Sequence, residues 1–162
     1  MRVSIEALFD GIRTPLKIDI TAGDKITPRE TLYRFNLMFE ERQIDIFAYN
    51  LETVLAEKLE TIISRGTTNT RMRDFYDIYI LQKMHSEILD KELLAKALVS
   101  TSINRGTYGV LAEGQTIINE VSNDIFMQGL WENYRKKYNY AEDIRWDEVI
   151  AAVNEIWQVS KD

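Results

Sequence analysis

The stretch of sequence that decides the fold runs from Leu51 to Gln82 and reads LETVLAEKLETIISRGTTNTRMRDFYDIYILQ. On both sides of a short polar segment, Gly66 to Thr70, apolar residues recur at the spacing of a core-facing α-helix. The pattern therefore predicts two helices joined by a loop. The residues expected on the two buried faces are Val54, Leu55, Leu59, Ile62 and Ile63 in the first helix and Phe75, Ile78, Tyr79 and Gln82 in the second.

The same two helices carry charged residues close to the expected core. Asp74 and Asp77 share one face of the second helix, and Arg73 lies within pairing distance of Asp77. A loop this short makes the helices antiparallel neighbours, so we expect Lys58 of the first helix to meet both aspartates. The alternative interpretation is that these are solvated surface pairs that contribute little, with Asp74 complementing the helix dipole.

Composition excludes several classes of function. The chain has 162 residues and a net charge of -6, so a nucleic-acid partner would have to be bound at a local basic site. The chain has no cysteine and a single histidine, His85, which leaves no thiolate nucleophile and no support for a zinc–cysteine site or a Ser-His-Asp triad. The absence of an apolar run of membrane-spanning length and of a signal peptide predicts a cytoplasmic protein without a membrane anchor.

The order of elements predicts an α+β fold. Alternating segments Arg2 to Phe9 and Pro15 to Ile20, and a hairpin from Tyr33 to Tyr49, predict about four strands in a partial sheet over residues 1–50. Residues 51–162 are expected to form a helical bundle, because strands followed by helices are typical of α+β proteins. The further helices expected there start at Asp90 and run to Ser102, start at Ser122 and run to Tyr138, and run from Trp146 to Val159.

The charged residues of the sequence suit the binding of phosphate and magnesium. The commoner cofactor and hydrolase motifs are absent. The sequence instead carries acids and bases on one expected strand, at Asp19, and on the two central helices. We expect Asp19 to face the same hollow as Lys58 and Asp77. Carboxylate oxygens are the ligands that Mg²⁺ prefers, and lysine and arginine offset the charge of a triphosphate.

Three motifs in order resemble the later part of the abortive-infection nucleotidyltransferase toxins of the AbiEii/AbiGii type: KIDI at residues 17–20, YNLETVLAEKL at 49–59 and RMRDFYDIYIL at 71–81. The resemblance implies a nucleotidyltransferase core followed by a helical bundle, an NTP substrate, an RNA acceptor such as tRNA, and an antitoxin partner. It implies that Asp19 binds the metal. The residues implied to bind the nucleotide are Glu57, Lys58, Arg71 and Arg73, and those implied in catalysis are Asp19, Lys58, Asp74 and Asp77.

Two departures from the family pattern bear on activity. Arg73 stands where the family has lysine, which keeps the charge but replaces a point donor with a planar fork. The first motif of the family, Gly-Ser followed by Asp-x-Asp, is not in this sequence. That motif supplies two of the three metal-binding carboxylates, so Mg²⁺ is expected only with a complete site. We therefore expect either the later portion of a longer enzyme, inactive as this chain alone, or a degenerate relative.

Two non-enzymatic alternatives remain open. The charged residues can form a structural ion-pair network that fixes the helix pair, in which case removal of one member is costly. The chain can also be an interaction module, since an incomplete sheet has an open edge that pairs with another chain or is covered in a homodimer.

Overall fold

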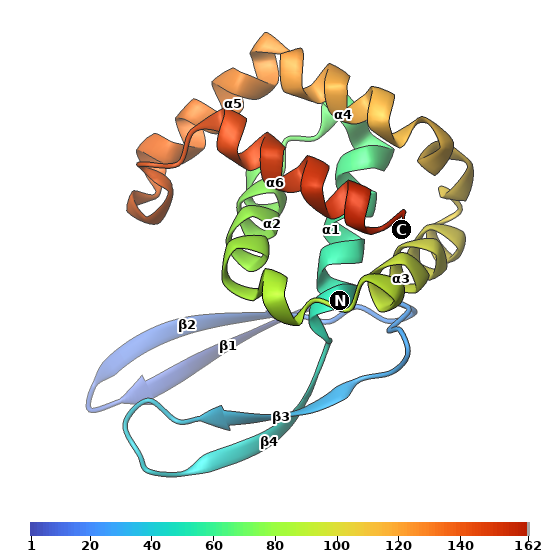
Figure 1. The fold of residues 1–162 in the computed structure, drawn as a ribbon. Helices are drawn as coiled ribbons and strands as arrows, with labels where there is room; N and C mark the ends of the chain where they lie inside the picture. Colours follow the sequence, from blue (N-terminus) through green and yellow to red (C-terminus); the bar gives the residue numbers. More distant parts are fainter. Residues whose placement is uncertain (162) are drawn as a thin grey trace.

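The computed structural model of the chain describes residues 1–161 and has the α+β fold that the sequence predicts. Within these residues four strands come first and six α-helices follow (Figure 1). The strands are β1 (Arg2–Phe9), β2 (Ile12–Asp19), β3 (Thr31–Asn36) and β4 (Gln43–Ala48). The helices are α1 (Leu51–Arg65), α2 (Met72–His85), α3 (Lys91–Arg105), α4 (Gly114–Asn123), α5 (Ile125–Lys137) and α6 (Trp146–Val159). Short 3-10 helices are η1 (Gly66–Thr68), η2 (Ser86–Ile88), η3 (Tyr108–Glu113) and η4 (Asn139–Ala141).

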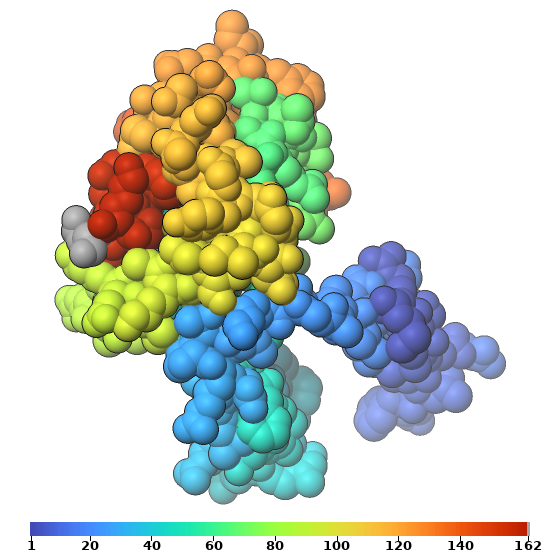
Figure 2. Space-filling view, turned by 90° about the vertical axis from the view of Figure 1, so that its right-hand side faces the viewer, coloured from blue at the N-terminus to red at the C-terminus, as the bar shows by residue number. Residues whose placement is uncertain are grey.

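The strands form two separate antiparallel hairpins, whereas the sequence predicts one partial sheet. β1 pairs only with β2, and β3 only with β4, among the described residues. The segment between the hairpins is bound to the helices instead: Asn50 Nδ2 donates to the Thr27 carbonyl at 2.6 Å, and Asn104 Nδ2 donates to the Gly23 carbonyl at 2.9 Å. The β1–β2 hairpin therefore stands away from the rest of the molecule (Figure 2).

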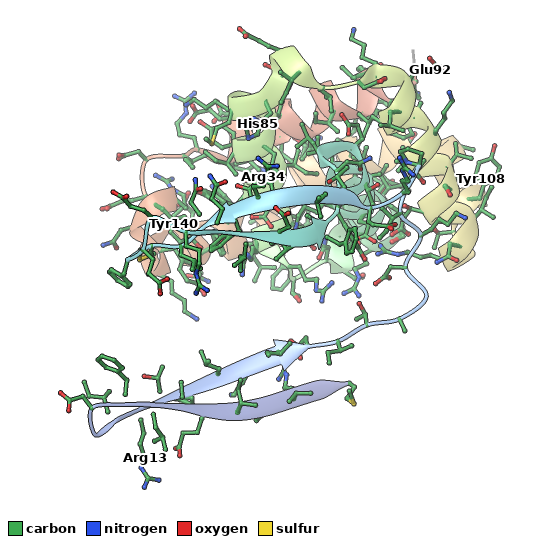
Figure 3. All side chains as sticks on the ribbon, turned by 90° about the horizontal axis from the view of Figure 1, so that it is seen from below. Arg13, Arg34, His85, Glu92, Tyr108 and Tyr140 are labelled. Carbon is green, nitrogen blue, oxygen red and sulfur yellow. The ribbon has the colours of Figure 1, made fainter. Side chains whose placement is uncertain are left out.

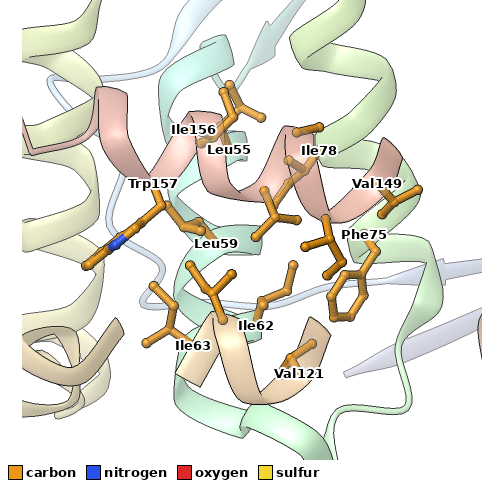
Figure 4. Close-up of a cluster of buried hydrophobic side chains, with 14 of the residues drawn as sticks. Leu55, Leu59, Ile62, Ile63, Phe75, Ile78, Val121, Val149, Ile156 and Trp157 are labelled. Carbon is orange, nitrogen blue, oxygen red and sulfur yellow. The ribbon is translucent and has the colours of Figure 1, made fainter. Parts of the chain in front are cut away.

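The core lies in the helical bundle, around α1, which contacts α2, α3, α4 and α6. Fully buried side chains from α1, α2, α4 and α6 interdigitate there (Figure 4). The predicted inner face of α1 is buried at Leu55, Leu59, Ile62 and Ile63, while Val54 is half-buried. On α2, Phe75 and Ile78 are fully buried. The helical bundle therefore buries its own apolar side chains.

The structure confirms one of the two predicted helix caps and corrects the other. Asp90 caps α3 as predicted, its side chain accepting from the Leu93 N–H at 3.0 Å. The cap predicted at Ser122 is wrong, because Ser122 lies inside α4 and Asp124 caps α5 by accepting from the Met127 N–H at 2.8 Å. One helix was thus expected where the sequence forms the end of α4 and the whole of α5. None of the helices within residues 1–161 is long and apolar enough to cross a lipid bilayer.

Candidate functional site

A lysine held between two aspartates lies where α1 and α2 run side by side. Lys58 Nζ is 2.6 Å from Asp77 Oδ2 and 3.3 Å from Asp74 Oδ1. The predicted contact of Lys58 with both aspartates is therefore confirmed. About a fifth of each of the three side chains is exposed, so the cluster is neither a solvated surface pair nor sealed in the core.

The loop between the helices sets this register. Gly66 ends α1 at φ 51°, a left-handed conformation that glycine adopts easily, and its N–H donates to the Ile62 carbonyl. The fully buried Asn69 then accepts from the Arg71 N–H at 2.9 Å. With the chain reversed in so few residues, the first turns of α2 lie beside the middle of α1, and Asp74 and Asp77 face Lys58.

A pocket of about 290 Å³ opens beside Lys58. It is lined by Val54, Glu57, Lys58, Thr61, Arg71, Asp74 and Arg105. Three of these side chains are cationic and two are carboxylates, and they come from α1, α2 and the end of α3. We call this space the Lys58 pocket. Its chemistry suits a polyanion such as a triphosphate, because lysine and arginine donors converge on one hollow.

Arg105, in the last turn of α3, is a member of the pocket that sequence reasoning missed. Its guanidinium lies 2.5 Å from Glu60 Oε2, 3.1 Å from Thr61 Oγ1 and 3.5 Å from Glu57 Oε1. The Glu60 side chain is only 3% exposed and also accepts from the Thr107 hydroxyl at 2.7 Å. The local sequence shows only a basic residue before the helix-ending Gly106, so no short-range pattern indicates this contact.

The surroundings of the Lys58 pocket shift the pKa values of two of its side chains, Glu57 and Arg105. Burial of Glu57 raises the pKa of its carboxyl, although the charge of Arg105 opposes that shift. Burial alone would lower the pKa of Arg105, but the hydrogen bond and the charge of Glu60 outweigh it, and the net pKa is raised. Arg105 thus stays charged, while the carboxyl of Glu57 takes up a proton more readily than an ordinary glutamate does.

The two arginines at the start of α2 are less constrained. Arg73 is 80% exposed, and its Nε lies 3.8 Å from Asp77 Oδ2. The side chain of Arg71 makes no ion pair within residues 1–161, and it lines the Lys58 pocket. Both guanidiniums are therefore available to a ligand, as expected for nucleotide-binding residues, and that role stays a prediction.

Asp19 does not lie in the Lys58 pocket, where we expected it to share a hollow with Lys58 and Asp77. It ends β2, is 61% exposed, and pairs with Arg2 through contacts of 2.6 and 2.9 Å. The hydrogen bond from Arg2 lowers the pKa of its carboxyl. Figure 3 shows the β1–β2 hairpin, with Arg13 at its tip, well apart from the helices. The physical reason is that this hairpin pairs only with itself among the described residues.

The described residues do not form a magnesium centre. No group of three or more histidine, cysteine or acidic side chains in residues 1–161 is placed to hold a metal ion. Asp74 and Asp77 both face the ammonium of Lys58, and Asp19 is a single carboxylate bonded to Arg2. Metal binding by Asp19 stays a prediction.

Comparison with known proteins identifies the family. The family described as nucleotidyl transferase AbiEii toxin, type IV TA system, matches residues 1–152. Searches of the curated proteins and of the solved structures found no match. The family match spans both hairpins and nearly all of the helical bundle. The chain therefore belongs to the AbiEii nucleotidyltransferase toxin family.

Proposed function

We propose that the Lys58 pocket binds the triphosphate of an NTP. We further propose that the chain is the later portion of a cytoplasmic toxin-type nucleotidyltransferase, which transfers NMP from the NTP to an RNA acceptor such as tRNA. The observation that carries this proposal is the position of Lys58, fixed by Asp74 and Asp77 at the side of a pocket shared with Arg71 and Arg105. Membership of the family supports the class of reaction.

Each residue of the pocket has a separate part in this proposal. Lys58 and Arg71 neutralise the phosphate oxygens, and the exposed fork of Arg73 can bind two of those oxygens at once. Glu57 helps to orient Arg105. Asp77 positions the ammonium of Lys58 at 2.6 Å. Asp74 Oδ2 is buried and has no hydrogen-bond partner among the described residues, so it can accept a hydrogen bond from an incoming hydroxyl.

The described acidic residues of this chain do not suit a magnesium ion by themselves. Transferases of this kind use a divalent ion to offset developing charge, but the acidic residues of residues 1–161 do not form a site for it. We therefore propose that this chain by itself binds the nucleotide and does not transfer it. The carboxylates that the family carries in its Asp-x-Asp motif would have to join Asp19 to complete the chemistry.

Isothermal titration of an NTP into the chain tests the proposal. We expect binding by the natural chain and at least about a tenfold loss with Lys58→Ala, since the charged hydrogen bonds at stake are worth about 1.5–3 kcal/mol. The matched control is Lys96→Ala, which removes an exposed lysine that pairs with Glu92 and does not line the Lys58 pocket. Equal binding by Lys58→Ala and the natural chain would refute the proposal.

A structural ion-pair network is the competing account of the same residues. It predicts that Asp77→Ala lowers the melting temperature sharply, because a charge is left without its partner. Our proposal predicts a small change in melting temperature together with a marked loss of NTP affinity, because Lys58 keeps its contact with Asp74. Differential scanning calorimetry and titration of the same variant separate the two accounts.

An interaction role is a second candidate, favoured by the exposed apolar side chains of both hairpins. Phe9 is 81% and Phe47 75% exposed. Such surfaces are normally covered by a partner, which here would be a second copy of the chain or an antitoxin protein. A strictly monomeric chain in light scattering would count against the homodimer.

A further inference from the structure

A second hollow, of about 500 Å³, lies between the start of α2 and the end of α5. Its walls are Thr70, Arg71, Met72, Arg73 and Asp74 on one side and Leu130, Asn133, Tyr134, Lys137 and Tyr138 on the other. We call it the α2–α5 groove. Arg71 and Asp74 line both this groove and the Lys58 pocket, so the two spaces meet at those side chains.

The groove is cationic in a chain that is acidic. Three basic side chains and one carboxylate line it, whereas the whole chain has a net charge of -6. Arg71 makes no ion pair within residues 1–161, and Arg73 lies a long 3.8 Å from Asp77. The ammonium of Lys137 lies 5.4 Å from the centre of the Tyr138 ring and forms no ion pair within the described residues. Carboxylates of the fold therefore neutralise these cations little, and together the cations form the local basic site that an anionic polymer would need.

The second wall of the groove is aromatic and rigid. The ring of Tyr134 stacks on Trp131 at 5.4 Å between centroids, and its hydroxyl lies 2.9 Å from that of Tyr140. Tyr138 packs against Tyr134 at 4.7 Å and stacks on Tyr140 at 5.3 Å. Because Trp131 is fully buried, this cluster of rings is anchored in the core. An ordered aromatic cluster beside cationic side chains is typical of surfaces on which nucleic-acid bases stack.

We propose that the α2–α5 groove binds the end of a single-stranded polynucleotide, with a base against Tyr134 and Tyr138 and the phosphates at Arg73 and Lys137. Lys58 does not line the groove, so binding of the strand does not depend on Lys58. Its identification as the acceptor rests on the function proposed above, and follows because Asp74 lines both the groove and the Lys58 pocket.

Fluorescence anisotropy with short labelled single-stranded RNA and DNA tests the groove directly. We expect saturable binding by the natural chain, and a loss of about fivefold or more with Tyr138→Ala, the lower limit for one stacked base. Lys137→Ala should weaken binding and lower the slope of log K against log salt by about 0.7, the value for one phosphate of a single strand. Tighter binding of RNA than of DNA would identify the 2′-hydroxyl as part of the recognition.

Matched controls come from the opposite end of the molecule. Tyr108 is 55% exposed and lies far from Tyr140 (Figure 3). Lys96 pairs with Glu92, which Figure 3 also places far from Tyr140. Tyr108→Ala and Lys96→Ala should bind the strand as the natural chain does. The proposal is overturned if no strand binds, or if the groove variants and the control variants lose affinity equally.

Failure of this inference is distinguishable from failure of the proposed function. Lys58→Ala should lose NTP while keeping the strand, and Tyr138→Ala should lose the strand while keeping NTP. If the strand binds and NTP does not, the groove stands and the proposed function falls. If NTP binds and the strand does not, the groove is refuted alone.

Discussion

The two halves of the molecule carry similar apolar residues in opposite surroundings. In the helical bundle Leu59, Phe75 and Trp131 are completely buried, whereas in the β1–β2 hairpin Leu8 is 68% and Phe9 81% exposed. The pairing of Val3 with Ile18, Ile5 with Leu16 and Phe9 with Ile12 gives that hairpin one apolar face. The bundle buries its own core, but a lone two-stranded hairpin has no second layer to cover its face.

This difference indicates which candidate sites the chain can form without a partner protein. The Lys58 pocket and the α2–α5 groove are built from helices and capping residues that the bundle itself holds in place. Asp19 instead lies on a hairpin whose side chains face open space, so its surroundings would change when a partner covers the hairpin. The predictions below test that contrast, beginning with the largest effect.

Truncation of a leucine should destabilise the protein strongly in the bundle and only slightly in the hairpin. Leu59→Ala is expected to lower the free energy of unfolding by about 2–5 kcal/mol, because it leaves a cavity in the core. Leu8→Ala, the matched change in the hairpin, should lower it by less than about 0.5 kcal/mol. Urea denaturation measures both, and equal losses would show that the hairpin is buried in solution.

Removal of one carboxylate should show the same contrast for ion pairs. Glu60→Ala leaves the Arg105 guanidinium and the Thr107 hydroxyl without their shared buried acceptor and should cost about 2–3 kcal/mol. Glu6→Ala breaks an exposed pair with Arg13, at 3.4 Å, and should cost less than about 0.5 kcal/mol. The contrast fails if the two variants unfold at the same denaturant concentration.

The pH dependence of stability should have opposite signs in the two halves. Burial raises the pKa of Glu57, so just above the ordinary glutamate pKa the folded chain binds more protons than the unfolded chain, and this contribution falls as the pH rises. Hydrogen bonding to Arg2 lowers the pKa of Asp19, so that contribution is present above the ordinary aspartate pKa and is lost as the pH falls.

Thermal unfolding across acidic to neutral pH checks these signs. Relative to the natural chain, Glu57→Gln should gain stability as the pH rises through the window of Glu57. The natural chain should be more stable than Asp19→Asn above the ordinary aspartate pKa, and this difference should disappear as the pH falls. Salt should also remove the difference, because both partners are exposed. A loss of stability by Glu57→Gln relative to the natural chain as the pH rises would contradict the assignment.

The smallest effect is expected from deletion of the β1–β2 hairpin. Its hydrogen bonds lie within itself, and the bundle is held to the following segment by Asn50, Thr53 and Asn104. A chain that begins at Thr21 should therefore melt within about 1 °C of the full chain, the shift that corresponds to about 0.3 kcal/mol for a domain of this size. A large drop would mean that the hairpin stabilises the bundle.

Local patterns in the sequence were sufficient to predict the helix pair and the contacts between its charged residues. Period and loop length predicted α1, α2 and the contact of Lys58 with Asp74 and Asp77, because neighbouring helices leave few ways to arrange such charges. The strand segments were also recognisable from alternation.

What the sequence did not reveal depends on long-range contacts. Arg105 reaches Glu60 across the bundle, and no short pattern encodes that distance. The division of the strands into two sheets depends on where residues 20–30 are bound, which Asn50 and Asn104 decide from elsewhere in the chain. Asp124 replaced Ser122 as the cap because both residue types cap helices, and only packing decides which of them ends the preceding turn.

The most direct test of the central claim is an NMR titration of the chain with an NTP, following every backbone amide. The account predicts shifts around Lys58, at Arg71 to Asp77 and at Arg105, with the amides of β1 and β2 unchanged. Saturating shifts confined to the hairpins, or no shifts at all, would contradict it.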